Sequence, residues 1–454
     1  MLLAGLCALM VGLMATPAVL ARLSSDGTLS AQFLERVHAL RIFMLSLGGV
    51  AVLAGALRLR GAVTAALLAA TGLLCAGAFG ILLLVQRYPD NLLGRPDRLW
   101  SVALGKEMLL SDYRPGTFLV TPKHEVLRAK YPAINIHAHF SRWILQRTPE
   151  QLARIMDDCN LQAIVNLDPR PGPELQEALA RYTQAYPDRF IMFTVFPFYK
   201  KLTDWPAFAS QVDHLAEAKA LGAKGVKIWK NLGMVTRDGQ GRLVPIDDPR
   251  LDPLWRKLGE LHMPVLIHVG DPIANYTRAD RYNEQYEWLQ SAPDWSYAGQ
   301  DVPSLDSLLA QFEHAVANHP ETIFILAHLG NRADDLRIPS RLLDRHPNLY
   351  MDFSAKVQEL GRQPRAARAF FLRYQDQLLF ATDGNPDQRD YRAHFRSLET
   401  ADEYFDYPFW GLFNFGRWKI YGIDLPDEVL RKLYHDNAAR LLGLPKLTQR
   451  ESRE

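Results

Sequence analysis

The feature that most constrains the fold is an eightfold alternation of short apolar runs with longer helical stretches, which starts near residue 131. The apolar runs are rich in β-branched residues, and such alternation is typical of βα units around a parallel sheet. Eight units in about 320 residues predict a closed (β/α)8 barrel, the TIM barrel fold. The predicted strands are Ala133–His139, Ala163–Leu167, Phe190–Phe196, Gly225–Trp229, Val265–Val269, Ile323–His328, Leu349–Phe353 and Leu378–Thr382.

Helix-start signals lie between these runs. Thr148 and Pro149 supply a capping hydroxyl and a proline for the first turn, and Ser304 and Pro426 mark two later helices. An open, doubly wound sheet is the alternative fold, but no glycine-rich nucleotide loop follows the first strand. The barrel is therefore the preferred prediction.

The first 90 residues differ in character from the barrel. Three largely apolar segments, about residues 2–21, 37–57 and 61–85, are long enough to cross a hydrocarbon core of roughly 30 Å. We expect these three transmembrane helices over residues 1–90, a linker and lead-in over 91–130, the barrel over 131–445 and a polar tail over 446–454. Cleavage of the first segment as a signal peptide near Ala21 is the alternative.

Arginine positions suggest an orientation for this multi-pass membrane segment. Six arginines flank the side that leads to the barrel, against two on the other side, Arg58 and Arg60. Because positive residues favour the inner face, this predicts a cytoplasmic barrel, with the lipid bilayer as a partner of the N-terminal helices. The six are Arg22, Arg36, Arg41, Arg87, Arg95 and Arg98.

Composition excludes several classes of function. The chain has 52 Lys and Arg against 50 Asp and Glu, a net charge of +2, and no run of like charge stands out. Without a basic patch we expect no nucleic-acid partner. Cys7, Cys75 and Cys159 are too scattered for a disulfide framework or a cysteine zinc site. Any metal in this chain would be held by His and carboxylate side chains.

Histidines and an aspartate follow four of the predicted strands. His137 and His139 share one face of the first strand because alternate side chains point the same way. His268, His328 and Asp383 each end another apolar run, and the carboxyl ends of barrel strands meet at one rim. Nitrogen and carboxylate ligands suit Zn²⁺, with Mn²⁺, Fe²⁺ or Co²⁺ as alternatives. The sequence therefore predicts a divalent metal site at this rim.

These motifs, in this order, resemble the amidohydrolase superfamily, and more narrowly its amidohydrolase-related branch, which includes aminocarboxymuconate-semialdehyde decarboxylase. The resemblance covers roughly residues 131–443. It lies in His137-Ala138-His139, His268, His328 in Ala-His-Leu-Gly, Asp383 in Ala-Thr-Asp-Gly and the C-terminal Asn437–Leu442.

The resemblance implies a role for each of these residues. His137, His139, His268 and Asp383 would hold the metal, and His328 would sit beside the water or substrate. In a hydrolase of esters, lactones or amides, Asp383 would act as general base and His328 would stabilise the oxyanion. In the alternative, a decarboxylase, His328 would manage the proton on carbon. An inactive membrane-anchored binding protein is the second alternative, and hydrolysis is the first expectation.

Lys227 falls on the fourth strand, where binuclear superfamily members resemble one another in having a carboxylated lysine that bridges two metals. The alternative is a lysine that pairs with Asp383 or with a substrate anion, and we expect one metal ion. Trp229 and Lys230 follow it and are candidate substrate-binding residues.

Three long loops leave the same rim, over residues 231–250, 271–303 and 384–425. The first contains a predicted hairpin turn at residues 237–241, and the other two are rich in aromatic residues. We interpret the loops as a lid and pocket wall for a small-molecule substrate. The alternative is that the aromatic residues pack on one another or on the membrane surface. Arg278 and Arg281 are candidates for contact with a substrate carboxylate. Assembly into a homo-oligomer stays open.

Overall fold

The computed structural model describes residues 116–140, 147–198, 201–407, 416 and 418–447. The three N-terminal segments predicted as membrane spans lie outside these residues.

Eight parallel strands form one sheet in the order β1-β2-β3-β5-β7-β8-β9-β10. All eight predicted strands are present, and each of them stops one to three residues before the predicted end. They are β1 (Ala133–Ala138), β2 (Leu161–Asn166), β3 (Phe190–Val195), β5 (Gly225–Ile228), β7 (Val265–Ile267), β8 (Phe324–Leu326), β9 (Leu349–Asp352) and β10 (Leu378–Leu379). A separate parallel pair joins β4 (Lys201–Leu202) to β6 (Arg237–Asp238).

The sheet closes on itself between its first and last strands. The backbone N–H of Ile136 donates to the carbonyl oxygen of Phe380 at 3.0 Å, and the N–H of Asp383 donates to that of His137 at 2.9 Å. A parallel bridge joins Ala138 to Gly384 just beyond. The fold is therefore a TIM barrel, and the open doubly wound sheet is excluded.

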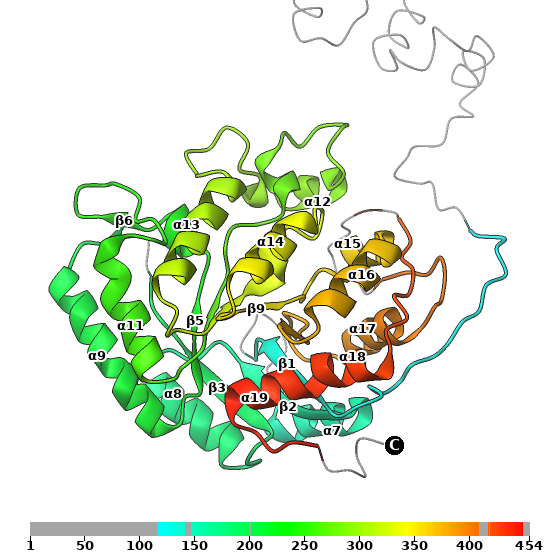
Figure 1. Ribbon diagram of the computed structural model, residues 1–454, viewed down its shortest axis with the longest axis horizontal. Coiled ribbons are helices and arrows are strands. Elements are labelled where there is room, and N and C mark those ends of the chain that lie inside the picture. The colour runs from blue at the N-terminus through cyan, green and yellow to red at the C-terminus, as the bar shows by residue number, and fades with distance from the viewer. Residues whose placement is uncertain (1–115, 141–146, 199–200, 408–415, 417, 448–454) are drawn as a thin grey trace, which may run out of the picture. The chain divides into compact units, whose positions relative to one another are not determined.

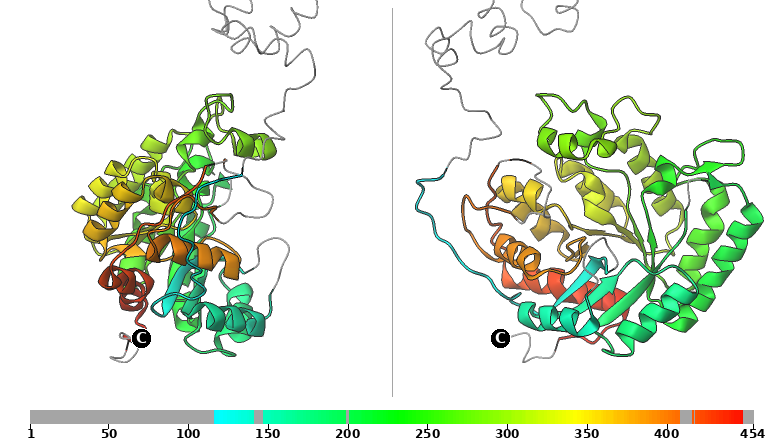
Figure 2. Two further views of the ribbon diagram at one scale, coloured as in Figure 1. Left: turned by 90° about the vertical axis from the view of Figure 1, so that its right-hand side faces the viewer. Right: turned by 180° about the vertical axis from the view of Figure 1, so that it is seen from behind.

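Helices surround the strands on all sides in both views (Figures 1 and 2). Helices lie in every connection between successive barrel strands and after the last one, as expected for βα units. They are α7 (Pro149–Cys159), α8 (Pro173–Ala178), α9 (Trp205–Leu221), α11 (Asp252–Glu260), α13 (Leu305–Asn318), α14 (Arg337–Arg345), α15 (Val357–Arg362), α16 (Pro364–Tyr374), α17 (Gln388–Glu399), α18 (Asp427–Arg431) and α19 (Asn437–Leu442). Short pieces in the connections are α10 (Asn231–Met234), α12 (Tyr286–Ser291), η1 (Leu179–Thr183), η2 (Pro249–Leu251), η3 (Ile273–Tyr276), η4 (Pro293–Trp295), η5 (Ala327–Asn331) and η6 (Lys432–Asp436).

The predicted helix starts are present. Thr148 caps α7 in a reciprocal capping box with Gln151, and Ser304 accepts a hydrogen bond from the backbone of Ser307 at the start of α13. Pro426 is the residue before α18. Local sequence therefore fixed where these helices begin.

Apolar side chains fill the barrel and the layer between strands and helices. Within the barrel Phe193 packs so closely on β5 that a Cβ at Gly225 would lie 2.4 Å from its ring. Only glycine fits there without a shift of the ring. Outside, Phe190 and Phe324 belong to the large cluster between strands and helices. This packing gives the strand ends a rigid frame.

Two of the three predicted long loops, over residues 231–250 and 384–425, contain regular structure. The hairpin turn is present, because the N–H of Gly241 donates to the carbonyl of Asp238 at 2.9 Å and Arg237 pairs with Leu243 in an antiparallel bridge. The segment 384–425 is not a loop throughout, since it contains the twelve-residue helix α17. The apolar positions of α17, including Tyr391 and Phe395, are buried.

The predicted location in a membrane is corrected by the structure. Among the helices of the described residues, none combines the length and the hydropathy needed to cross a bilayer. The expectation of a multi-pass protein depends on the apolar segments of residues 1–90, and that of a cytoplasmic barrel depends on the arginines that flank them.

Candidate metal centre

The first two histidines are held at the end of β1 by buried carboxylates. His137 Nδ1 lies 2.9 Å from Asp352 Oδ2, and His139 Nδ1 lies 2.5 Å from Asp168 Oδ1. Carboxylates in this position orient imidazoles whose other nitrogen binds a metal. The Nε2 atoms of both rings lie 3.1 Å from one oxygen of Asp383.

Asp383 follows β10 in a left-handed backbone conformation, with φ of 60°. Its Oδ1 contacts His137 and His139, and its Oδ2 lies 3.6 Å from His328 Nε2. Burial raises the pKa of Asp383, but its interactions with His137, His328 and His139 outweigh burial and hold this pKa well below its usual value. The carboxyl group is therefore ionised and available as a ligand or a base.

His328 is fixed by its own backbone and by a serine after β9. Its φ is 58°, its N–H donates to Asp352 Oδ1 at 3.0 Å, and its Nδ1 lies 2.9 Å from the carbonyl oxygen of Ser354. Left-handed backbone at a non-glycine residue is a strain often found at functional sites. Burial lowers the pKa of His328 from 6.5 to about 4. At neutral pH the ring is uncharged, and its Nε2 faces Asp383.

One nitrogen each of His137 and His328 and one oxygen of Asp383 all lie within 4.8 Å of one another, as the ligands of a single ion do. His268 lies beside them, with its ring centroid 4.6 Å from that of His328. Its Nε2 is buried and has no hydrogen-bond partner among the described residues. Such an atom is costly unless something binds it. Burial lowers the pKa of His268 well below 6.5, which keeps the ring neutral as metal ligation requires. The residues therefore fit a divalent metal.

Lys227 is fully buried and reaches the same cluster. Its Nζ lies 3.2 Å from His137 Nε2, and its positive charge acts on both His137 and His268. Its side chain also lies 5.0 Å from the centre of the Trp229 ring. Lys227 therefore lies close enough to the histidines for either predicted role, as a bridge between two metal ions or as a partner of Asp383 or a substrate anion.

Trp229 and Lys230 lie on the rim beside the histidines. The Trp229 ring stacks on His139, with a centroid distance of 5.1 Å and an interplanar angle of 24°. Lys230 Nζ lies 2.5 Å from Asp271 Oδ2, 3.1 Å from the Tyr297 hydroxyl and 3.9 Å above the Trp295 ring. Lys230 therefore joins β5 to the loop 271–303.

The structure does not bring Arg278 and Arg281 to this cluster. Both are exposed, and the guanidinium of Arg281 lies 5.1 Å from the ring of Tyr282, which is itself 82% exposed. An exposed arginine side chain is hydrated and does not require a carboxylate beside it. Their prediction as carboxylate ligands gains no geometric support.

Asp168, Asp352 and Ser354 were missed by the sequence reasoning. Asp352 ends the apolar run Leu349–Met351 just as Asp383 follows Leu378–Thr382, so the same signal was present. Its carboxyl group accepts hydrogen bonds from the backbone of His328 and Ser354, each at 3.0 Å. Burial raises the pKa of Asp352, yet the interactions with His137 and His328 outweigh burial and lower this pKa below its usual value. The carboxyl group therefore stays charged.

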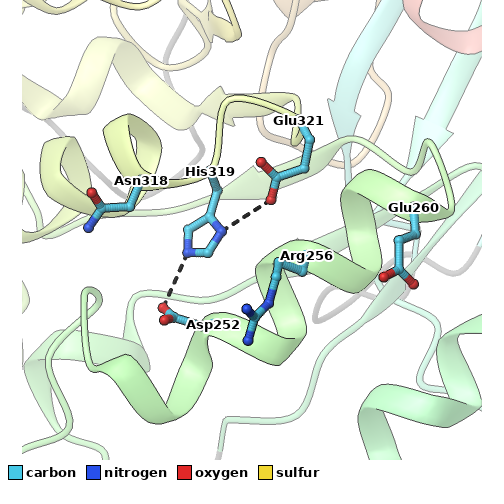
Figure 3. A pocket seen from close by; sticks show the side chains of 6 residues that line it. All are labelled: Asp252, Arg256, Glu260, Asn318, His319 and Glu321. Atoms are coloured by element: carbon cyan, nitrogen blue, oxygen red, sulfur yellow. Dashed lines mark hydrogen bonds and ion pairs between the residues drawn. The ribbon is translucent and has the colours of Figure 1, made fainter.

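A separate pocket lies at the other end of the barrel (Figure 3). Its His319 is 3.2 Å from both Asp252 and Glu321 and precedes β8, whose far end carries His328. The amino-terminal ends of barrel strands usually serve stability rather than catalysis. This pocket is lined by Asp252, Arg256, Glu260, Asn318, His319 and Glu321.

This chain is similar to several known proteins. Gamma-resorcylate decarboxylase from Rhodococcus jostii is 25% identical over 191 residues, which cover 39% of this chain and 54%, about half, of that relative. 2,6-Dihydroxybenzoate decarboxylase from Rhizobium is 16% identical in a structural match with a TM-score of 0.43 that covers 69% of this chain and 99% of the other. An amidohydrolase from Burkholderia multivorans with bound zinc is 14% identical, with a TM-score of 0.39 and coverage of 69% and 100%.

The sequence model of the family described as amidohydrolase matches residues 165–444, which is more than half of the chain. This range contains the strand ends that carry Lys227, His268, His328 and Asp383. The chain therefore belongs to the amidohydrolase family.

Proposed function

We propose that the protein is a metal-dependent decarboxylase that acts on a small organic carboxylate. The observation that carries the metal dependence is the convergence of His137, His328 and Asp383 within 4.8 Å. The similarity to gamma-resorcylate decarboxylase supports carbon–carbon cleavage over hydrolysis, which had been the first expectation from the sequence. An aromatic acid is the substrate class that this relative suggests.

His137, His139, His268 and Asp383 are the proposed ligands of one divalent ion, with zinc as the first choice for such nitrogen and oxygen donors. A metal bound there supplies Lewis acidity, which neutralises charge on a substrate oxygen. Asp352 and Asp168 hold the first two imidazoles in position through their Nδ1 atoms. Lys227 is the proposed additional contact for a second ion or for the substrate.

His328 is the proposed proton carrier. In decarboxylation the bond between carbon and carboxylate breaks, carbon dioxide leaves, and the electron pair left on carbon takes up a proton. His328 Nδ1 is held by the Ser354 carbonyl group, so Nε2 is the nitrogen free to accept and deliver that proton. With a pKa of about 4 the ring is neutral at pH 7, so Nε2 first takes a proton from solvent water and then passes it to the carbon.

Hydrolysis is the second candidate, and the ionised state of Asp383 favours it. A carboxylate that contacts two imidazoles at 3.1 Å can take a proton from a water molecule and pass it to His328 Nε2, which then donates it to the oxyanion. The same residues therefore serve either reaction, and the fold does not separate the two.

Isotope labelling distinguishes decarboxylation from hydrolysis. The full-length protein, loaded with zinc or manganese, is incubated with gamma-resorcylate and a panel of related aromatic acids in D₂O. Decarboxylation releases carbon dioxide and leaves one deuterium on the carbon that lost it. In parallel, esters, lactones and amides are tested in ¹⁸O-labelled water, where hydrolysis places the label in the acid product.

Release of carbon dioxide with deuterium incorporation, lost on chelation and restored by metal, is the expected result. Label from ¹⁸O water in an acid product, with no carbon dioxide from any aromatic acid, would make the protein a hydrolase.

A further inference from the structure

Lys356 is a second buried lysine close to the site, and none of the motifs includes it. It follows β9 and is only 3% exposed. It stands two residues after Ser354, whose hydroxyl donates to Asp352 Oδ1 at 2.5 Å and lies 2.9 Å from His328 Nδ1. The backbone that carries Lys356 is therefore anchored to the same network that holds His328.

The charge of the Lys356 ammonium group acts on two parts of the site. Burial lowers the pKa of His328, and the charge of Lys356 lowers it further. Burial raises the pKa of Asp271, while the charges of Lys230 and Lys356 oppose that rise. Lys356 thus lies near both the histidine cluster and the base of the loop 271–303.

Lys230 and Lys356 differ in how many of their ammonium donors have a partner. An ammonium group has three donors. That of Lys230 contacts Asp271, Tyr297 and the Trp295 ring, as described above. That of Lys356 has one ion pair, with Glu359 Oε1 at 3.6 Å, and no hydrogen bond among the residues that the structure describes. A buried cation held this loosely is expensive, and an anionic ligand would offset its cost.

We propose that Lys356 is the second anion-binding point of the site, so that the preferred ligands are organic acids with two separated anionic groups. One group lies at the metal and the other at the Lys356 ammonium group. This inference rests on the proposed function for its first anion-binding point. It assigns Lys356 a role in substrate choice.

Two aromatic acids test it in the zinc-loaded, full-length protein. Calorimetry compares the affinity for benzoate, with one carboxylate, and isophthalate, with two. A charge-assisted hydrogen bond to a buried lysine makes a difference of about 10- to 100-fold. We expect isophthalate to bind at least tenfold more tightly than benzoate, and Lys356→Met to reduce this preference to within about twofold.

The controls separate recognition from folding. Lys224→Met removes an exposed lysine before β5, at the opposite end of the barrel, and keeps the full preference. Lys356→Arg retains the charge and part of the preference. If Lys356→Met does not fold, an equal loss of affinity for both acids in Lys356→Arg indicates a purely structural lysine and overturns the proposal.

The proposal also fails if the parent protein does not prefer isophthalate, or if Lys356→Met keeps the preference. These outcomes are independent of the reaction. A preference that depends on Lys356 without any release of carbon dioxide would refute decarboxylation and leave anion binding in place. Decarboxylation without such a preference would refute the anion-binding role of Lys356 and leave the proposed reaction in place.

Discussion

At the scale of single residues, the imidazoles of the rim differ in what occupies their nitrogens. His328 has its Nδ1 held by Ser354 and its Nε2 near Asp383, whereas His268 Nε2 is buried without a partner. A neutral imidazole with an unpartnered buried nitrogen is the better metal ligand of the two. The structure also places His328 among the three closest donors, so the two roles must be separated by measurement.

We expect His268→Ala to lose bound metal and activity, and His328→Ala to keep metal and lose activity. The reason is that His268 Nε2 is buried with no hydrogen-bond partner among the described residues, whereas His328 Nδ1 is held by Ser354. Metal content of the purified variants, measured by mass spectrometry beside turnover, checks this. A His328→Ala protein without metal would make His328 a ligand, and near two ions per chain in the parent would contradict a one-metal site.

The residues that sequence reasoning could find were those at the ends of apolar strands. The histidines and Asp383 stood out because a solvated side chain does not favour such a position. Asp352 carried the same signal and was passed over. Ser354 could not be found, because its role depends on a left-handed residue, Ala355, and on a tertiary contact with His328.

At the scale of elements, periodicity located every strand of the barrel but overestimated how far all eight of them extend. β8 was predicted to reach His328 and ends at Leu326, and β10 was predicted to reach Thr382 and ends at Leu379. The reason is physical, since the backbone leaves the hydrogen-bonded ladder where it must turn functional side chains toward the rim. His328 and Asp383 have positive φ values because the backbone leaves the extended conformation of the strand there.

Asp271 ties the loop 271–303 to the barrel, and its replacement tests that tie. Asp271→Asn leaves the Lys230 ammonium group without its carboxylate, so we expect the free energy of unfolding to fall by about 1–3 kcal/mol. Amide hydrogen exchange over residues 272–303 should rise while that of α9 stays constant. Asp301→Asn is the control, because Asp301 is 91% exposed and its surface pair with Arg237 contributes little. Equal exchange in both variants would show that Asp271 does not hold the loop.

At the scale of the whole molecule, the buried histidines make folding depend on pH. Burial lowers the pKa of His328 from 6.5 to about 4, so between these values the unfolded chain binds a proton that the folded chain does not. Stability is therefore full above pH 6.5 and falls as the pH drops through this window. From pH 7 to pH 5 the metal-free protein should lose about 2 kcal/mol through this residue alone.

Urea unfolding of chelator-treated protein at pH 7, 6 and 5 measures this loss. His328→Gln has no imidazole to protonate, so its stability should fall less over the same range. If parent and variant lose the same amount, the ring is not held neutral by the fold.

The whole barrel was predictable because eight repeats leave few other arrangements. The predicted membrane location found no support, because no helix of the described residues is long and apolar enough to cross a bilayer. Whether the protein cleaves carbon–carbon bonds or adds water lay beyond the sequence, since one set of residues serves both reactions.

The hydrogen bond from the Asp383 backbone to His137 joins the last strand to the first, so the seam of the barrel and the metal centre coincide. A ribosome releases the His137 and His139 pair early and Asp383 only near the end of synthesis. A nascent chain therefore has no complete centre until its final strand has emerged, and a prematurely terminated product is an open sheet without activity.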